Sequence, residues 1–331
     1  KKMKPYEELT FRGKILRLRK LCIKALENYL IDVARVRYLT TESTTMFRVD
    51  TTDGSKYVIR LYSEFDSSLA ENQTEMFWLA ALARDTDLRV VESVARKDGD
   101  YITFVSMEGI PNEKRCALYK WVPGVQLAEH ISPKNYEQFG QIVAQMHNHA
   151  EGLELPNYVQ PKRWDKVFYF PDEPVVYNTP EYTSLFTAEQ LSTLETTIDR
   201  VSPFLAGMYR DSHPFIIHGD LHYWNVHISR GKLHIIDFED MVFGFPLQDI
   251  AISFYYLRNR KDYKTLTDAF LAGYARERNL PPFNERDLHL LWMARMANFV
   301  NYVAHMDEPE DAKPFIESRC RELGEFLAKV S

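Results

Sequence analysis

Hydrophobic and polar residues alternate along the first part of the chain in a pattern that predicts short strands joined by turns. Alternation with a period of two places one face of a strand against a core. The dipeptides Asp53-Gly54 and Asp98-Gly99 interrupt this pattern, and Asp-Gly between alternating runs is typical of a tight turn. The predicted strands cover Val36–Leu39, Met46–Val49 and Tyr57–Leu61, and a further strand ends at Trp121-Val122.

Helices are predicted on both sides of the first three strands. A basic amphipathic helix is expected at about Ile15–Leu30. The next helix begins with the capping-box pattern Ser68-Leu69-Ala70-Glu71 and runs to about Arg84. We therefore expect a small antiparallel sheet with one packed helix in residues 1–120.

From Pro133 onward the apolar positions recur every three to four residues, which predicts helices. Pro123-Gly124 separates the two patterns, so we expect one domain at residues 1–120 and a second at 121–331. The proline-rich stretch Pro156–Pro180 is expected to be an ordered loop insertion. The predicted helices are Tyr136–His149, Ala188–Leu205, Gln248–Leu257, Tyr263–Arg278 and Arg286–Met306.

Composition narrows the class of protein. The chain has 331 residues, of which 45% are hydrophobic and 27% are charged, as in a globular protein of about two domains. Its net charge of −6 disfavours a nucleic-acid partner, because nucleic-acid-binding domains usually carry a basic face. The three cysteines are far apart, which suits a reducing compartment, and no apolar run reaches the ~18 residues of a membrane helix. We expect a cytoplasmic protein with no membrane partner.

The spacing of the glycines disfavours several enzyme classes. The chain has 13 glycines, and the closest consecutive pair is Gly99 and Gly109. The Rossmann, Walker A and nucleophile-elbow motifs all need glycines a few residues apart. A dinucleotide-binding dehydrogenase, a P-loop NTPase and an ordinary α/β-hydrolase are therefore disfavoured, and the glycine-rich loop of protein kinases is missing as well.

Histidines and carboxylates are concentrated in the segment from His213 to His234, and this segment contains five of the ten histidines. In this region Asp220 precedes Asn225 by five residues, and Asp237 follows the next predicted strand. In phosphoryl transfer, a carboxylate accepts the proton of the acceptor hydroxyl, while an asparagine and a second carboxylate hold Mg²⁺ against the nucleotide phosphates. Mg²⁺ prefers hard oxygen ligands, so no histidine ligand is required. The spacing predicts that these three residues converge at one end of a small hairpin.

The segment His218-Gly219-Asp220-Leu221-His222-x-x-Asn225, followed by Ile236-Asp237-Phe238, resembles the catalytic region of a known superfamily. This is the aminoglycoside phosphotransferase, choline kinase and type II homoserine kinase superfamily of protein-kinase-like small-molecule kinases. The resemblance implies an α+β, two-lobed protein-kinase-like fold, with a small antiparallel-sheet N-lobe and a larger, mainly helical C-lobe. It also implies ATP- and Mg²⁺-dependent phosphorylation of a small-molecule hydroxyl.

The resemblance assigns roles within the catalytic region. Asp220 is implied to be the catalytic base or the carboxylate that orients the hydroxyl, and Asn225 and Asp237 are implied to bind Mg²⁺. His218 is expected to brace the loop through hydrogen bonds. Asp249 is expected to be structural, either as a helix N-cap or as a brace for the loop.

The resemblance also implies which residues contact the nucleotide. Arg60 occupies the position of the strand residue that reaches the phosphates, where protein kinases and many relatives have a lysine, and the two residues are not interchangeable. Glu75 matches its helix partner, although Glu71 lies on the same helix face and competes for that role. The implied hinge is Leu118–Gly124, where Trp121 and Val122 are expected to contact the nucleotide.

A short hydroxyl-rich connection at residues 40–46 occupies the position of the phosphate loop. Ser43 and Thr44 are the expected phosphate contacts there, and an ordinary polar turn is the alternative interpretation.

The sequence indicates the acceptor site less specifically than it indicates the catalytic residues. Between Leu233 and Leu257 there are four acidic residues and no lysine or arginine, which favours a cationic acceptor such as an amino alcohol, a hydroxy amino acid or an aminoglycoside. Candidate acceptor contacts are His222, Trp224, Glu239 and Asp240, with Tyr223, Trp164 and Tyr255 as further aromatic candidates for walling the pocket.

Two other functions remain open from the residues. His218, Asp220 and His222 alternate along the chain and provide the ligand types of a metal-dependent hydrolase. A nucleotide-binding pseudokinase or scaffold is the second alternative, because Arg60 replaces the usual lysine. A protein kinase is disfavoured, since Asp237-Phe238-Glu239 replaces Asp-Phe-Gly. The oligomeric state is not indicated by the sequence.

Overall fold

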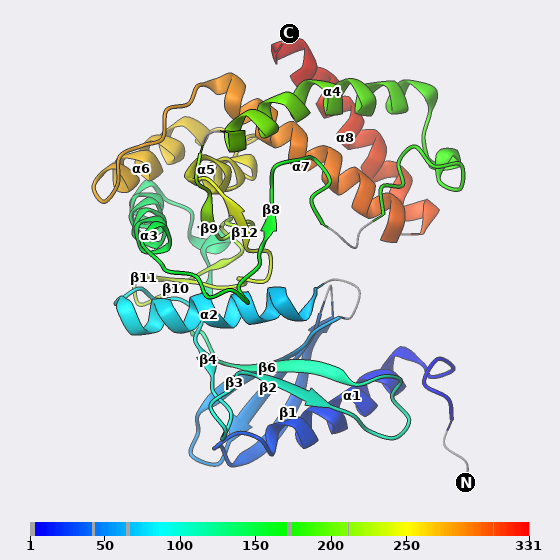
Figure 1. Ribbon diagram of the computed structural model, residues 1–331, viewed down its shortest axis with the longest axis vertical. Coiled ribbons are helices and arrows are strands. Elements are labelled where there is room, and N and C mark those ends of the chain that lie inside the picture. Colours follow the sequence, from blue (N-terminus) through cyan, green and yellow to red (C-terminus); the bar gives the residue numbers. More distant parts are fainter. Residues whose placement is uncertain are drawn as a thin grey trace. The chain divides into compact units, whose positions relative to one another are not determined.

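The computed structural model describes residues 4–41, 44–63, 67–170, 174–210, 212–306 and 308–330. The chain divides into two compact units (Figure 1). The first comprises Lys1–Val125, Leu155–Gln160 and Val226–Glu239, and the second comprises Gln126–Glu154, Pro161–Asn225 and Asp240–Ser331. Because two later segments belong to the first unit, no division at a single chain position separates the units.

The first unit contains an antiparallel sheet of six strands with the order β1-β2-β3-β6-β4, in which β5 also pairs with β6. The predicted Asp53-Gly54 hairpin is confirmed, since β2 and β3 pair antiparallel up to Asp50 opposite Lys56, and Gly54 has a φ of 85°. The strands are β1 (Val33–Thr41), β2 (Thr45–Thr51), β3 (Lys56–Leu61), β4 (Ser93–Val94), β5 (Ile102–Val105) and β6 (Lys114–Lys120).

Helix α1 (Phe11–Leu26) begins and ends four residues before the predicted helix. The reason for the earlier start is Thr10, whose side chain accepts a hydrogen bond from the Gly13 N–H and caps the helix. The helix buries Leu21, Cys22, Ala25 and Leu26 in a core that also contains Phe47, Val49 and Ile59 from the sheet.

Helix α2 (Leu69–Asp85) begins with the predicted capping box. The Ser68 side chain accepts from the Glu71 N–H at 3.2 Å, and the Glu71 carboxylate accepts from the Ser68 N–H at 2.7 Å. This reciprocal cap gives Glu71 a local structural role and leaves the next turn of the helix to present Glu75.

The first unit also contains the hairpin formed by β10 (Val226–Ser229) and β11 (Lys232–Ile235). Arg230 and Gly231 form its turn with φ values of 51° and 74°, which is the backbone geometry of a two-residue hairpin. Val90 bridges to Ile235, which ties this hairpin to the segment after α2. The hairpin leads directly to Asp237.

The second unit is mainly helical. Helices α3 and α6 pack closely because glycine backbones lie in the contact: a Cβ added at Gly140 would lie 1.9 Å from the Phe270 carbonyl oxygen, and one at Gly273 would lie 1.8 Å from that of Glu137. The helices are α3 (Pro133–Glu151), α4 (Ala188–Arg210), α5 (Pro246–Tyr255), α6 (Tyr263–Ala275), α7 (Glu285–Met306) and α8 (Pro309–Val330), with short 3-10 helices at Leu127–His130 and Thr183–Leu185.

The predicted helices of this unit are present with shifted ends, and α8 is additional to those expected. Its buried residues recur at helical spacing from Ala312 and Ile316 to Phe326 and Val330, but Pro309 and Pro314 interrupt the sequence pattern at its start. Among the described residues, no helix is both long and apolar enough to cross a membrane.

A small sheet has the strand order β8-β12-β9, with β8 at Lys162–Arg163, β12 at Val242–Gly244 and β9 at Phe215–Ile217. The short strand β7 covers Val125–Gln126. The described part of the proline-rich segment is tied to α7, since Asn301 accepts from the Val176 N–H at 2.7 Å and Asn298 donates to the Val167 carbonyl at 3.2 Å. Strand β9 matters most for function, because the histidine-rich loop follows it.

Candidate active site

The loop that follows β9, residues 218–225, is braced by one buried carboxylate. Asp249 lies in the first turn of α5 and is 0% exposed. It accepts hydrogen bonds from the backbone N–H groups of His218 at 3.0 Å and Gly219 at 2.9 Å, and Nε2 of His147 lies 3.1 Å from it. Asp249 is therefore placed to brace the loop, whereas the N-cap of α5 is Phe245.

His218 is buried beside this brace. Its Nδ1 accepts a hydrogen bond from the backbone N–H of Asp220 at 3.3 Å. The ring thus fixes the backbone at the residue that the sequence singles out as catalytic.

Gly219 allows the loop to turn toward Asp220. It has a φ of 80°, and a Cβ added to it would lie 2.1 Å from the Asp240 carbonyl oxygen. Both the backbone conformation and the close approach require glycine.

We expect Gly219→Ala to reduce the free energy of unfolding by about 3 kcal/mol, since left-handed strain contributes about 1–2 kcal/mol and overpacking about 1–3 kcal/mol. Gly231→Ala is the matched control, because Gly231 has a φ of 74° but nothing within 4 Å of an added Cβ. Denaturant unfolding of both variants measures the difference, and equal losses would contradict the packing argument.

The Asp220 carboxylate is surrounded by donors from its own loop and from α7. Oδ2 accepts from Nδ2 of Asn225 at 3.0 Å and lies 3.2 Å from Nε2 of His222, while Oδ1 accepts from Nη2 of Arg295. Burial alone would raise the pKa of the Asp220 carboxyl, but the charges of His222 and Arg295 together hold that pKa well below its ordinary value. Asp220 is therefore ionised at neutral pH.

Asn225 is oriented by the same contacts. Its Nδ2 donates to the backbone carbonyl of Asp220 at 2.9 Å as well as to the carboxylate. No donor among the described residues reaches its amide oxygen, which is left as an open acceptor. An open, hard oxygen held in place by two hydrogen bonds is suited to a Mg²⁺ ligand.

A second polar cluster lies in the first unit around Arg60 on β3. Its Nη1 donates to Oε1 of Glu75 at 3.2 Å, and its Nη2 donates to Oδ1 of Asp237 at 2.9 Å. Glu239 completes the anionic surroundings at 3.6 Å from Nη1. The guanidinium therefore connects α2 with the segment after β11.

Glu75 is held in the interior by two phenols. Tyr119 donates to its Oε1 at 2.9 Å and Tyr62 donates to its Oε2 at 3.2 Å. Burial raises the pKa of the Glu75 carboxyl, and the nearby charge of Arg60 opposes that rise. Since Glu71 is engaged in the helix cap, the structure pairs Glu75 rather than Glu71 with Arg60.

Asp237 has an unusual backbone conformation, with a φ of 66°. Aspartate tolerates the left-handed region better than most residues, and strained residues cluster at functional sites. Its side chain is 39% exposed, and no donor among the described residues reaches Oδ2. Asp237 thus offers one open carboxylate oxygen while Arg60 holds the other.

The residues expected to contact the nucleotide differ in their burial and in their neighbours. Ser43 lies outside the described residues, while Thr44 is 3% exposed and its hydroxyl has no partner among them. Trp121 is half-buried after β6, with the Arg48 guanidinium 5.0 Å from its ring centroid. Val122 is half-buried next to it.

The expected acceptor contacts are divided between the two units. The ring centroids of His222 and Tyr256 lie 4.5 Å apart, and those of Trp224 and Tyr256 lie 5.2 Å apart. The Trp224 residue is 40% exposed. Glu239 belongs to the first unit, beside Arg60, and Asp240 belongs to the second.

The aromatic candidates and acidic residues differ from the expected arrangement. Trp164 and Tyr255 are 1% and 3% exposed, so they are core residues. Asp249 is buried in backbone hydrogen bonds, and Asp237 and Glu239 pair with Arg60. Three of the four acidic residues counted in the sequence are therefore engaged in contacts within the protein.

The three residues expected to converge belong to two different units. Asp220 and Asn225 are in contact within the second unit, whereas Asp237 belongs to the first unit and contacts Arg60. Across the described ranges, no group of three or more His, Cys, Asp or Glu side chains has the arrangement of a metal site, and this includes His218, Asp220 and His222.

Arg295 is the site residue that sequence reasoning missed. It lies on α7, where nearly every neighbour is buried, and it is itself only 8% exposed. A signal was present, because Arg295, Asn298 and Asn301 recur every three residues within an otherwise apolar helix. Polar residues in a buried helix need partners, and the partner of Arg295 is Asp220.

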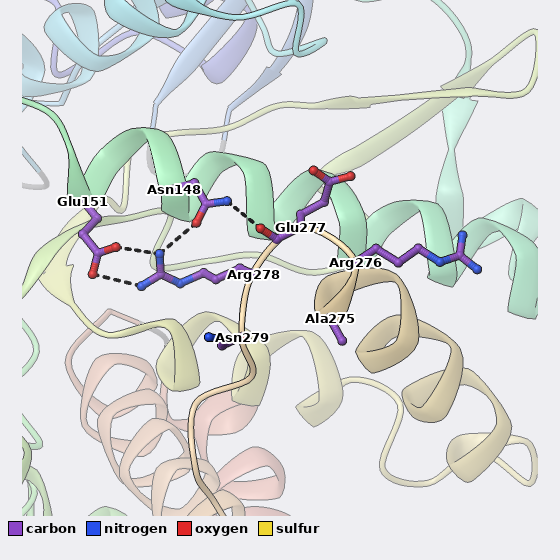
Figure 2. Close-up of a pocket in the computed structure, with 7 residues that line it drawn as sticks. All are labelled: Asn148, Glu151, Ala275, Arg276, Glu277, Arg278 and Asn279. Atoms are coloured by element: carbon purple, nitrogen blue, oxygen red, sulfur yellow. Dashed lines mark hydrogen bonds and ion pairs between the residues drawn. The ribbon is translucent and has the colours of Figure 1, made fainter.

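A surface pocket in the second unit lies apart from these residues. Figure 2 shows it at the ends of α3 and α6, where Arg278 donates to both Glu151 oxygens at 2.7 and 3.0 Å and to Asn148 at 2.9 Å. Its polar groups largely satisfy one another, and none of the candidate catalytic residues lines it.

The model of the phosphotransferase enzyme family matches residues 37–290, while no curated protein sequence matches. An amicoumacin kinase, solved with AMP-PNP, Ca²⁺ and its ligand, is similar in structure with a TM-score of 0.77 and 17% identity, over 94% of this chain and 96% of that one.

Two further solved structures have the same fold. A microcompartment-associated aminopropanol kinase has a TM-score of 0.76 and 20% identity, covering 94% of this chain and 98% of its own. A spectinomycin phosphotransferase, solved with ADP and spectinomycin, has a TM-score of 0.65 and 11% identity over 94% and 98%. With a family model that spans most of its length, the chain belongs to the phosphotransferase enzyme family and has the protein-kinase-like fold of small-molecule kinases.

Proposed function

We propose that this phosphotransferase transfers the γ-phosphoryl group of Mg²⁺-bound ATP to a hydroxyl of a small, amine-bearing molecule. The observation that carries the proposal is the surroundings of Asp220. An ionised carboxylate is held by Arg295 and His222 and bonded to the amide of Asn225. Phosphoryl transfer relies on positioning and electrostatic stabilisation, which such a fixed carboxylate supplies.

Asp220 is proposed to accept a hydrogen bond from the acceptor hydroxyl. Because its pKa lies well below the ordinary value, it is a weak base toward a ground-state alcohol. Its main contribution is then to orient the hydroxyl, and it takes the proton once bonding to phosphorus has acidified the oxygen. This order agrees with a loose transition state, in which the nucleophile is little changed.

The residues present suit a divalent metal. Asn225 is held through its Nδ2 and keeps its amide oxygen open, while Asp237 has one carboxylate oxygen bonded to Arg60 and the other open. Both open atoms are hard oxygen ligands. Mg²⁺ would supply charge neutralisation at the nucleotide phosphates. AMP-PNP with Ca²⁺ in the amicoumacin kinase structure, and ADP in the spectinomycin phosphotransferase structure, support nucleotide and metal as cofactors here.

Arg60 is proposed to take the place of the usual lysine at the phosphates. It is buried, pairs with Glu75 and extends to Asp237, so the ion pair between strand and helix is present with arginine in it. Thr44, with an unpartnered hydroxyl, and the half-buried Trp121 and Val122 are proposed as further nucleotide contacts. Ser43 is proposed as a phosphate contact on the basis of the sequence alone.

The amine on the acceptor is supported by the aminopropanol kinase, whose named substrate carries one. The exposed ring of Trp224 and the carboxylate of Asp240 in the second unit are proposed to receive it, with His222 beside them. We also propose a cytoplasmic location, supported by Cys22, Cys116 and Cys320, which are all free and buried.

A screen of ATP consumption tests the function directly. The purified protein with Mg²⁺ and ATP is offered amino alcohols, hydroxy amino acids, sugars and aminoglycosides, and phosphoester formation is followed by ³¹P NMR. We expect turnover with at least one amine-bearing alcohol and none without Mg²⁺. Tight nucleotide binding without turnover on any acceptor would favour a scaffold, and zinc retained through purification without nucleotide binding would favour a hydrolase.

A further inference from the structure

Arg295 has more hydrogen-bond donors than the protein uses. A guanidinium carries five N–H groups, and the contacts made by Arg295 engage only Nη2, which donates to Asp220 and to the Tyr256 hydroxyl at 3.0 Å. Nε is buried without an acceptor, and no described residue accepts from Nη1. A charged group that is more than nine-tenths buried with unused donors is costly unless something else accepts from them.

The walls around this guanidinium are aromatic. The Phe299 and Tyr256 ring centroids lie 4.6 and 5.5 Å from its central carbon. Such rings hold a planar guanidinium in one orientation and exclude water from its faces, which leaves the nitrogen edge as the part available to a ligand. The partly exposed Trp224 packs on the same Tyr256 ring, and the Asp220 side chain is 20% exposed.

We propose that Nη1 of Arg295 binds a carboxylate of the acceptor while Asp220 holds the acceptor hydroxyl. The inference rests on the proposed function and narrows its acceptor from amine-bearing alcohols in general to hydroxy amino acids. A carboxylate is the group that best matches the planar fork of a guanidinium.

The geometry also limits the size of the acceptor. Asp220 is bonded to the same guanidinium that would hold the carboxylate, so hydroxyl and carboxylate must lie within a few covalent bonds of each other. Small β- and γ-hydroxy amino acids meet this requirement. A large amino sugar without a carboxylate does not use the free donors.

Matched acceptor pairs test the inference. Serine is compared with 2-aminoethanol, and threonine with 1-aminopropan-2-ol, because each pair differs only in the carboxylate. Any further acceptor that the screen identifies is paired in the same way. We expect kcat/KM to be about 10- to 100-fold higher for the member with the carboxylate, the scale of one charge-assisted hydrogen bond.

Variants separate acceptor binding from the positioning of Asp220. Arg295→Gln is expected to bring the ratio of kcat/KM within each pair close to one, mainly through KM of the hydroxy amino acid. Any effect of the variant on Asp220 acts equally on both members and cancels in the ratio. Tyr256→Phe removes the hydroxyl that shares Nη2 but keeps the guanidinium, so its ratio should equal that of the wild type.

Three results would overturn the inference and leave the proposed function standing: a ratio near one in the wild-type enzyme, a ratio unchanged by Arg295→Gln, or a variant in which only KM for ATP rises. The last result would assign the guanidinium to the transferred phosphoryl group. Absence of phosphorylation with every acceptor would overturn both proposals. The wild-type ratio needs no variant, so it decides the question even where Arg295→Gln does not fold.

Discussion

Replacing Asp220 by asparagine is expected to lower kcat by about 10²–10⁴-fold, the usual contribution of a catalytic acid–base group. The variant keeps the size of the side chain but removes the charge that pairs with Arg295 and the basic carboxylate that takes the proton of the substrate hydroxyl. Affinity for Mg²⁺·ATP, measured by calorimetry, should change little, since the phosphates are assigned to other residues.

The Asp220→Asn variant needs a matched control. Asp262→Asn also removes an aspartate paired with an arginine in the second unit, but that pair with Arg260 is exposed, and we expect near wild-type turnover. Loss of one partner of a buried ion pair destabilises proteins, so thermal unfolding must show that Asp220→Asn is folded under assay conditions. A folded Asp220→Asn enzyme with near-normal turnover would refute the role of Asp220.

Asp237→Asn is expected to weaken Mg²⁺·ATP binding by about 10- to 100-fold, the scale of one charge-assisted interaction. Asparagine tolerates the left-handed backbone at this position, where φ is 66°, so the substitution tests charge rather than backbone strain. Arg60 also loses one of its carboxylate partners in this variant. Calorimetric titration with Mg²⁺·AMP-PNP measures the effect.

The control for Asp237→Asn is Asp85→Asn. Asp85 pairs with Arg84 at the exposed end of α2 in the same unit, and its loss should leave nucleotide affinity within about twofold of wild type. Unchanged affinity in Asp237→Asn would remove Asp237 from the metal site, and an equal loss in both variants would show that the effect is not specific to Asp237.

Local sequence patterns were sufficient to predict β1, β2, β3 and the capping box, whereas the short strands β7, β8 and β12 were not predicted and β6 ends at Lys120, before the predicted Trp121-Val122. The spacing of Asp220 and Asn225 within one loop predicts their contact, because five residues of a tight turn keep them together. The Ser68 cap and the Asp53-Gly54 turn are likewise determined by residues that are close in the sequence. The α1 boundaries were wrong by four residues, since the polar Thr10 cap precedes the apolar pattern.

Long-range partners could not be predicted in this way. Arg295 lies 75 residues beyond Asp220, and Arg60 lies 177 residues before Asp237, so no periodicity links either pair. The acidic count near the loop suggested a strongly negative acceptor site. In the structure, Asp237 and Glu239 lie beside Arg60, and Asp249 is buried among backbone N–H groups, so three of the four carboxylates are engaged in contacts within the protein.

The most direct test of the central claim is product analysis by ³¹P NMR with Mg²⁺·ATP and an amine-bearing alcohol, for the wild type and Asp220→Asn side by side. We expect the wild type to form a phosphoester one-for-one with ADP, and the variant to form it about 10²–10⁴-fold more slowly. Nucleotide binding without a phosphoester for any acceptor, or equal rates for the two proteins, would contradict the central claim.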